Sequence, residues 1–94
     1  MKSVQDALYN WLTIHLVADA RPHDAAARDT ASFFLAILES DFGVTAVNAI
    51  KDETNGRYVV KYVQGGKKKS AYFPVELAEA MWRQIEAEPK KYGS

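Results

Sequence analysis

The chain has 94 residues, of which 48% are hydrophobic and 26% charged, a composition typical of one small globular domain and unlike that of disordered chains. Its 12 basic and 12 acidic side chains cancel, so the overall charge gives no reason to expect a polyanionic partner. The lack of cysteine excludes disulfides, thiol catalysis and thiolate metal sites, and a domain that needs no disulfide fits a reducing cytoplasm. We therefore expect a single cytoplasmic domain over residues 1–94.

The N-terminal segment has neither secretory nor membrane-spanning character. Gln5, Asp6 and Asn10 interrupt what would have to be the apolar core of a signal peptide. The longest nearly apolar run, from Trp11 to Ala18, is far shorter than the roughly 20 residues that a membrane-spanning helix requires. We expect no secretion and no membrane partner.

Ser3 and Asp6 have the spacing of a helix capping box, which predicts a helix that begins there and continues through Ala18. Its polar residues, Asp6, Asn10 and Thr13, form a narrow stripe, and apolar residues cover the other sides. A helix that is apolar on so many sides must either lie centrally in the fold or meet a second subunit.

Pro22 interrupts the helical pattern and fits the first position of a new helix. The second helix runs to about Asp41, with Gly43 as its stop signal. Two amphipathic helices joined by a short loop predict an αα-hairpin. The inward stripe expected for the second helix consists of Ala27, Ala31, Phe34, Leu35, Leu38 and Phe42.

From Val44 the apolar residues alternate, in "VTAVNAIK", "YVVKYVQ" and "KSAYFP", as they do in strands. Asn55-Gly56 and Gly65-Gly66 lie between these segments and predict two hairpin turns, hence a three-stranded antiparallel meander. Alternation leaves open which side of the second strand faces the helices. The two sets are Tyr58, Val60 and Tyr62 on one side, and Arg57, Val59, Lys61 and Val63 on the other.

Pro74 ends the third strand and opens a final helix, which Pro89 closes. Residues 88–94 are expected to form a frayed tail. The apolar face of this helix consists of Leu77, Ala78, Met81, Trp82 and Ile85, and its solvated face of Glu76, Glu79, Arg83 and Glu86.

The predicted fold class is α+β: an αα-hairpin, a three-stranded antiparallel meander and a C-terminal helix, in the order α-α-β-β-β-α, with the helices on one face of the sheet. The expected core consists of Trp11, Leu12, Phe34, Leu38, Phe42, Val60, Phe73, Met81 and Ile85.

Neither a metal site nor an active site is indicated. His15 and Asp19 are four residues apart on the first helix and His23 follows, but two histidines without a further defined ligand do not specify a metal site, so we expect no metal and no cofactor. The serines lie in no nucleophile-elbow sequence, and Gly65-Gly66 precedes a strand rather than the helix N-terminus that binds phosphate. We therefore expect no enzymatic activity.

Positive charge is concentrated in one segment: residues 44–73 carry six basic and two acidic side chains, net +4, against −3 for residues 1–43 and −1 for residues 74–94. If the tyrosines of the second strand are inside, the outer face of the sheet carries a basic patch; if they are outside, they offer stacking platforms for single-stranded nucleic acid. Alternatively, the three consecutive lysines only keep an exposed strand from pairing with another chain. The candidate binding residues are Arg57, Tyr58, Lys61, Tyr62, Lys67, Lys68 and Lys69.

The element order from Asp24 to Ala87 is similar to that of the double-stranded-RNA-binding domain. In that family a lysine-rich motif lies at the start of the last helix and faces phosphates. Here the lysines lie in the third strand, and the last helix opens with "PVELAEAM", whose glutamates would repel phosphate. The RNA-binding mode of that family therefore does not carry over to this chain.

The sequence favours a small non-enzymatic protein that acts through protein–protein interaction, with itself as a homodimer or with a partner, in a regulatory role. The basis is the first helix, which exposes more apolar surface than one small core needs, and the pairing of acidic helices with a basic sheet. The alternative is nucleic-acid binding by the outer face of the sheet and the basic segment 57–69.

Overall fold

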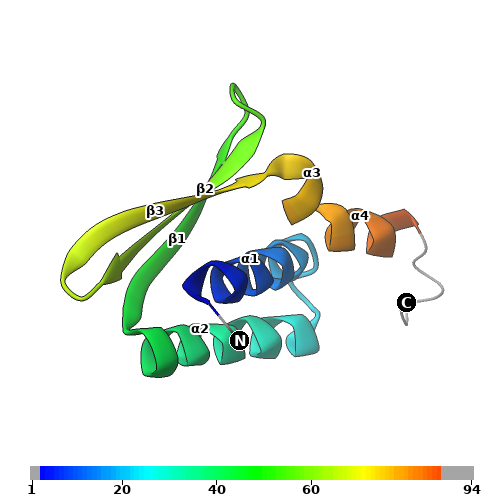
Figure 1. Cartoon of the computed structure of the whole chain (residues 1–94). Coiled ribbons are helices and arrows are strands. Elements are labelled where there is room, and N and C mark those ends of the chain that lie inside the picture. The colour runs from blue at the N-terminus through cyan, green and yellow to red at the C-terminus, as the bar shows by residue number, and fades with distance from the viewer. Residues whose placement is uncertain (1–2, 88–94) are drawn as a thin grey trace.

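A computed structural model describes residues 3–87 of the chain, and the predicted α+β order is confirmed (Figure 1). The predicted tail, 88–94, and Pro89 lie outside the described residues. The last predicted helix is divided in two. In chain order the elements are α1 (Val4–Ala20), α2 (Ala25–Phe42), β1 (Val44–Asp52), β2 (Arg57–Gln64), β3 (Lys67–Pro74), α3 (Val75–Ala78) and α4 (Ala80–Ala87).

Local hydrogen bonds set the ends of the first two helices. The Ser3 hydroxyl accepts from the Asp6 N–H at 3.1 Å, as the capping pattern predicts. At the next helix the Asp24 carboxylate accepts from the Ala27 N–H at 3.0 Å, so α2 begins at Ala25, three residues after Pro22. Gly43 ends α2 with φ +63°, a conformation that favours glycine.

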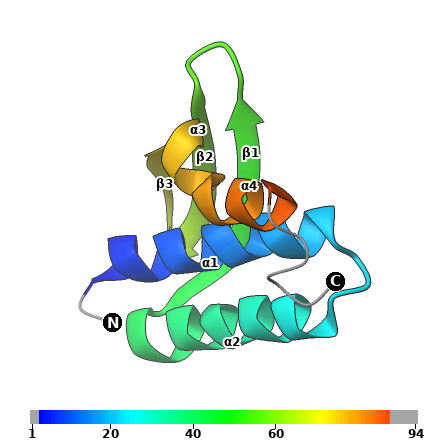
Figure 2. The same ribbon diagram turned by 90° about the vertical axis from the view of Figure 1, so that its right-hand side faces the viewer.

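The αα-hairpin forms the base of the molecule, and α1 lies between α2 and the sheet (Figures 1 and 2). Ala7, Leu8 and Leu12 are fully buried there, so α1 takes the central position in the fold. Thr13, expected in the solvated stripe, is also buried, and its hydroxyl donates to the Asn10 carbonyl at 3.0 Å. That internal hydrogen bond is what allows a polar residue in this position.

The sheet is an antiparallel meander in the order β1-β2-β3. Both predicted turns are present, with positive φ at Gly56, Gly65 and Gly66. Tyr58, Val60 and Tyr62 point toward the helices and are buried, which decides the question that strand alternation left open.

Of the expected core residues, five are buried, three are partly buried and one is exposed. The exposed one is Met81, at 44%, and its placement in the core was wrong. The inward side of the last helix runs instead through Ala78 and Glu79, while Leu77 is 56% exposed. The buried five are Trp11, Leu12, Leu38, Val60 and Phe73, and the partly buried three are Phe34, Phe42 and Ile85.

A β-bulge interrupts the pairing of β1 with β2 between Thr45 and Asn48. Within it Ala46 has φ +55°, a left-handed conformation that costs a residue with a Cβ roughly 1–2 kcal/mol. Ala49, three positions on, is in regular register with Val60.

The bulge predicts opposite outcomes for two glycine substitutions on one strand. Ala46→Gly relieves the strain and should leave the free energy of unfolding unchanged or raise it by up to ~1 kcal/mol, whereas Ala49→Gly, the matched control, should lower it by ~1 kcal/mol. Urea unfolding followed by circular dichroism measures both. Equal losses in the two variants would contradict the strained conformation of Ala46.

Candidate functional site

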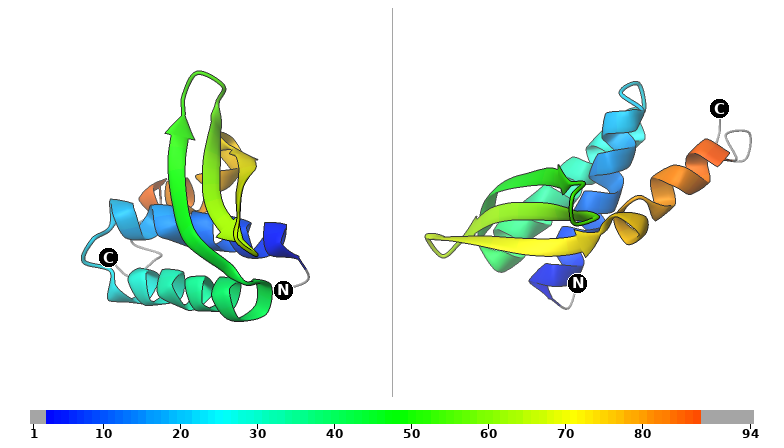
Figure 3. Two further views of the ribbon diagram at one scale, coloured as in Figure 1. Left: turned by 90° about the vertical axis from the view of Figure 1, so that its left-hand side faces the viewer. Right: turned by 90° about the horizontal axis from the view of Figure 1, so that it is seen from above.

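The strand register defines the face of the sheet that points away from the helices, which we call the outer face. Seen from the left of Figure 1, the strands lie in front of the helices, and seen from above they lie over α2 (Figure 3). No element among residues 3–87 covers it. From one end to the other, its rows of paired residues are Asp52–Arg57–Pro74, Ile50–Val59–Tyr72, Asn48–Lys61–Ser70 and Val63–Lys68.

One row of the outer face is apolar across all three strands. Ile50 is 43% exposed, Tyr72 is 51% exposed, and Val59 between them is half-buried. The Arg57 guanidinium lies 4.4 Å from the centroid of the Tyr72 ring, a cation–π contact, and its Nε lies 3.2 Å from Asp52 Oδ2. Arg57 thus holds the Tyr72 ring against the sheet while leaving half of it exposed.

The candidate basic residues do not form one group. Arg57, Lys61 and Lys68 lie on the outer face, whereas Lys67 and Lys69, opposite Gln64 and Tyr62, lie on the other side of the strand. Lys69 Nζ donates to Gln64 Oε1 at 3.1 Å. Because β3 is an edge strand, this arrangement agrees with the interpretation that the lysines protect an edge.

The two candidate tyrosines are on the inner face of the sheet. Tyr58 is 7% exposed and Tyr62 8%, so neither ring is accessible for stacking on a base. The exposed aromatic residue on the described strands is Tyr72, which the sequence analysis did not single out. Tyr72 lies on the outer face because it pairs with Val59, and that pairing depends on the register of β3.

A buried carboxylate joins the sheet to the C-terminal helices. Glu79, expected on the solvated face, is 6% exposed and lies at the break between α3 and α4. It accepts a hydrogen bond from the Tyr58 hydroxyl at 2.6 Å and contacts Lys51 Nζ at 3.1 Å and Arg83 Nη2 at 2.7 Å. The assignment of Glu79 to the solvated side of the helix was wrong. Helical spacing can indicate its contact with Arg83, but its other partners, Tyr58 and Lys51, lie on the strands.

These contacts shift the pKa values of both partners. Burial alone would raise the pKa of Glu79, but hydrogen bonds from Tyr58, Arg83 and Lys51, together with the Lys51 charge, outweigh it and lower the pKa from 4.5 to about 2. Burial and the hydrogen bond to Glu79 raise the pKa of Tyr58 above its ordinary value. The cluster therefore carries a charged carboxylate and a neutral phenol at neutral pH.

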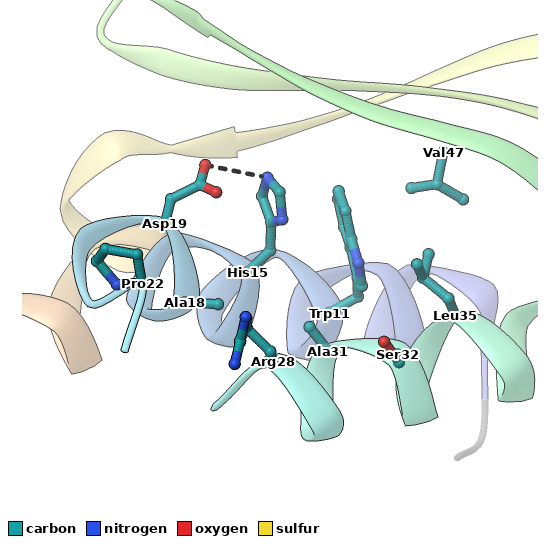
Figure 4. Close-up of a pocket in the computed structure, with 10 residues that line it drawn as sticks. All are labelled: Trp11, His15, Ala18, Asp19, Pro22, Arg28, Ala31, Ser32, Leu35 and Val47. Atoms are coloured by element: carbon teal, nitrogen blue, oxygen red, sulfur yellow. Dashed lines mark ion pairs between the residues drawn. The ribbon is translucent and has the colours of Figure 1, made fainter. Parts of the chain in front are cut away.

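A cleft of about 570 Å³ opens between α1, α2 and β1 (Figure 4). On α1 the His15 ring stacks on Trp11, with centroids 4.6 Å apart and planes at 18°, and its Nε2 lies 3.4 Å from Asp19 Oδ2. Across from them α2 contributes Arg28, and β1 contributes Val47. The sequence could show the helical spacing of His15 and Asp19, but not that a strand closes the space beside them.

This cleft does not have the geometry of a metal site or of a nucleophilic active site. Within residues 3–87, no three His, Cys, Asp or Glu side chains are placed to hold a metal ion, and exposed His23 does not line the cleft. Ser32 does line it, but no hydrogen bond joins Ser32 to His15, as a nucleophile and its base require.

A scan against protein-family models found no matching family, and searches of curated proteins and of solved structures found no significant match. The likeness in element order to the double-stranded-RNA-binding domain thus gains no support. In the described part of the chain, no helix has the length and apolarity needed to cross a bilayer. Functional inference therefore depends on the surfaces described above.

The Glu79 cluster predicts a pH-dependent loss of stability in Glu79→Gln. Because the pKa of Glu79 is lowered by folding, its stabilisation is fully present above the unfolded value near 4.5 and is lost as the pH falls toward 2. The variant should unfold at pH 7 with about 2–3 kcal/mol less free energy than the wild type, and the difference should vanish near pH 2.

Denaturant unfolding at several pH values between 2 and 7 measures the difference. Tyr58→Phe is the matched control: it removes one hydrogen bond and leaves both cations, so it should cost only about 1 kcal/mol at pH 7. A Glu79→Gln deficit that stays constant over the whole pH range would contradict this account of the cluster.

Proposed function

We propose that this chain is a cytoplasmic, non-enzymatic protein that acts through protein–protein interaction on its outer face, with itself or with a partner, in a regulatory role. The observation that carries the proposal is the row Ile50–Val59–Tyr72, an apolar strip across an uncovered sheet. Isolated exposed apolar residues are ordinary, but a continuous row in register is the kind of surface that a partner covers.

The charges around the row define the chemistry of the partner. Lys61 lies in the next row and Lys68 in the row beyond it, and neither has an ion-pair partner within residues 3–87, while Arg57, on the other side, is paired with Asp52. A complementary surface presents apolar side chains to the row and carboxylates to the lysines. Such charge complementarity determines orientation and the rate of association more than it determines affinity.

A second copy of the chain offers a surface of this kind. On the solvent side of α2, Phe33 is 61% exposed, with exposed Asp29 one turn before it and exposed Ala36 one turn after. Since α2 and the outer face lie on opposite sides of α1 (Figure 1), the contact is head-to-tail. Direct pairing of two outer faces would instead bring the lysines of both copies together.

The proposal predicts that association depends on Tyr72. Sedimentation velocity between about 10 and 500 μM should show a mass that rises with concentration for the wild type and a monomer for Tyr72→Glu. Leu77→Glu, an equally exposed residue on α3 away from the outer face, is the matched control and should associate like the wild type. A wild type that is monomeric throughout, or loss of association in both variants, would overturn the proposal for self-association.

Nucleic-acid binding is the second candidate, and the observation in its favour is that Arg57, Lys61, Lys68 and exposed Tyr72 share one open face. Fluorescence anisotropy with labelled RNA and DNA, single- and double-stranded, tests it at about 50 and 200 mM salt, where phosphate contacts weaken steeply. Lys61→Glu with Lys68→Glu should abolish binding, and Lys67→Glu with Lys69→Glu, on the other side of β3, is the control. Absence of binding at the lower salt concentration would eliminate this candidate.

A further inference from the structure

We propose that the cleft between α1, α2 and β1 is a second binding site, one for a small organic anion that has a flat apolar body, such as an aromatic carboxylate. The site is separate from the outer face and does not depend on the function proposed for that face. Its volume, about 570 Å³, lies within the range of small-molecule sites.

The first argument is an unsatisfied donor. Trp11 is 3% exposed, and its Nε1–H has no hydrogen-bond acceptor among the described residues, although the indole lines the cleft. In Figure 4 the indole nitrogen lies on the α2 side of the ring, toward Ala31 and Ser32. A buried donor without an acceptor is costly, and because this nitrogen is itself buried, a small shift of the indole would be needed for it to donate to an acceptor atom of a ligand in the cleft.

The second argument is an unpaired cation. Arg28 lines the cleft and extends toward Ala18 (Figure 4), and its guanidinium has no ion-pair partner within the described residues. Apart from Arg28, residues 1–43 carry two basic and six acidic side chains, net −4, and Asp19 pairs with His15 rather than with Arg28. A planar guanidinium is suited to bind a carboxylate through two parallel hydrogen bonds.

The third argument is the polarity of the cleft along α2. Arg28, Ser32 and Leu35 follow one another on a helical stripe, so the cationic end and the apolar end are about 10 Å apart. Leu35, expected in the inward stripe of the second helix, is 39% exposed and faces the cleft with Val47 of β1. A ligand would therefore place its carboxylate at Arg28, with one oxygen directed toward Trp11 Nε1, and its apolar ring against Leu35 and Val47.

The test uses the indole N–H signal of Trp11 in ¹⁵N–¹H spectra of the intact chain, assigned with the variant Trp82→Phe. Indole-3-acetate is the anionic probe and indole-3-acetamide its neutral isostere. We expect a saturable shift of the Trp11 signal, with the acetate bound more tightly than the acetamide by about fivefold or more.

Arg28→Gln should reduce the affinity for the acetate to that for the acetamide, because it removes the charge that discriminates them. Lys67→Gln, which removes an exposed cation on β3, is the control and should keep the full discrimination. The proposal is overturned if the Trp11 signal shows no saturable shift up to about 10 mM probe, if the wild type binds acetate and acetamide equally, or if discrimination persists in Arg28→Gln.

Discussion

The burial of α1 on several sides is the constraint on which the rest of the fold depends. Leu8, Leu12 and Trp11 cannot be covered by one neighbour, so the helix needs a layer on each side, and α2 and the sheet provide them. The short helix α3 then packs beside α1 against the same face of the sheet, and α4 follows it along α1. A small chain that forms three layers, α2, α1 and the sheet, has no described element left to cover the opposite face of the sheet. Ile50 and Tyr72 are exposed for this reason.

Glu79 shows how the last segment is attached without a large apolar face. Its carboxylate connects Tyr58 of β2, Lys51 of β1 and Arg83 of α4, and each of its two oxygens has at least one partner. A buried ionic cluster adds little stability compared with apolar packing, but it imposes one geometry because removing a single partner leaves a charge unsatisfied. The helix breaks at Glu79, where the carboxylate points into the protein. Leu77 and Met81, on either side of the break, are exposed.

The sequence predicts those features of the fold that arise from neighbouring residues. The Ser3 cap, the Gly43 stop and the glycine turns depend on local backbone chemistry, and all are present. The α+β order follows from the periodicity between them. Contacts between distant segments were not predictable in this way: the inward placement of Glu79 depends on Tyr58 and Lys51, 21 and 28 positions away along the chain.

The residues of the candidate surfaces also differ in whether neighbouring residues or contacts between distant segments determine their positions. Lys61 and Arg57 could be named as candidates from alternation alone, but Tyr72 joins them only through the register of β3, and the cleft exists only because β1 passes over the hairpin of helices. Alternation along β1 also connects the two surfaces. Val47 faces the cleft, while Asn48 and Ile50 belong to the outer face. The bulge at Ala46 sets this alternation, because a shift of one residue would exchange the sides on which Val47 and Asn48 lie.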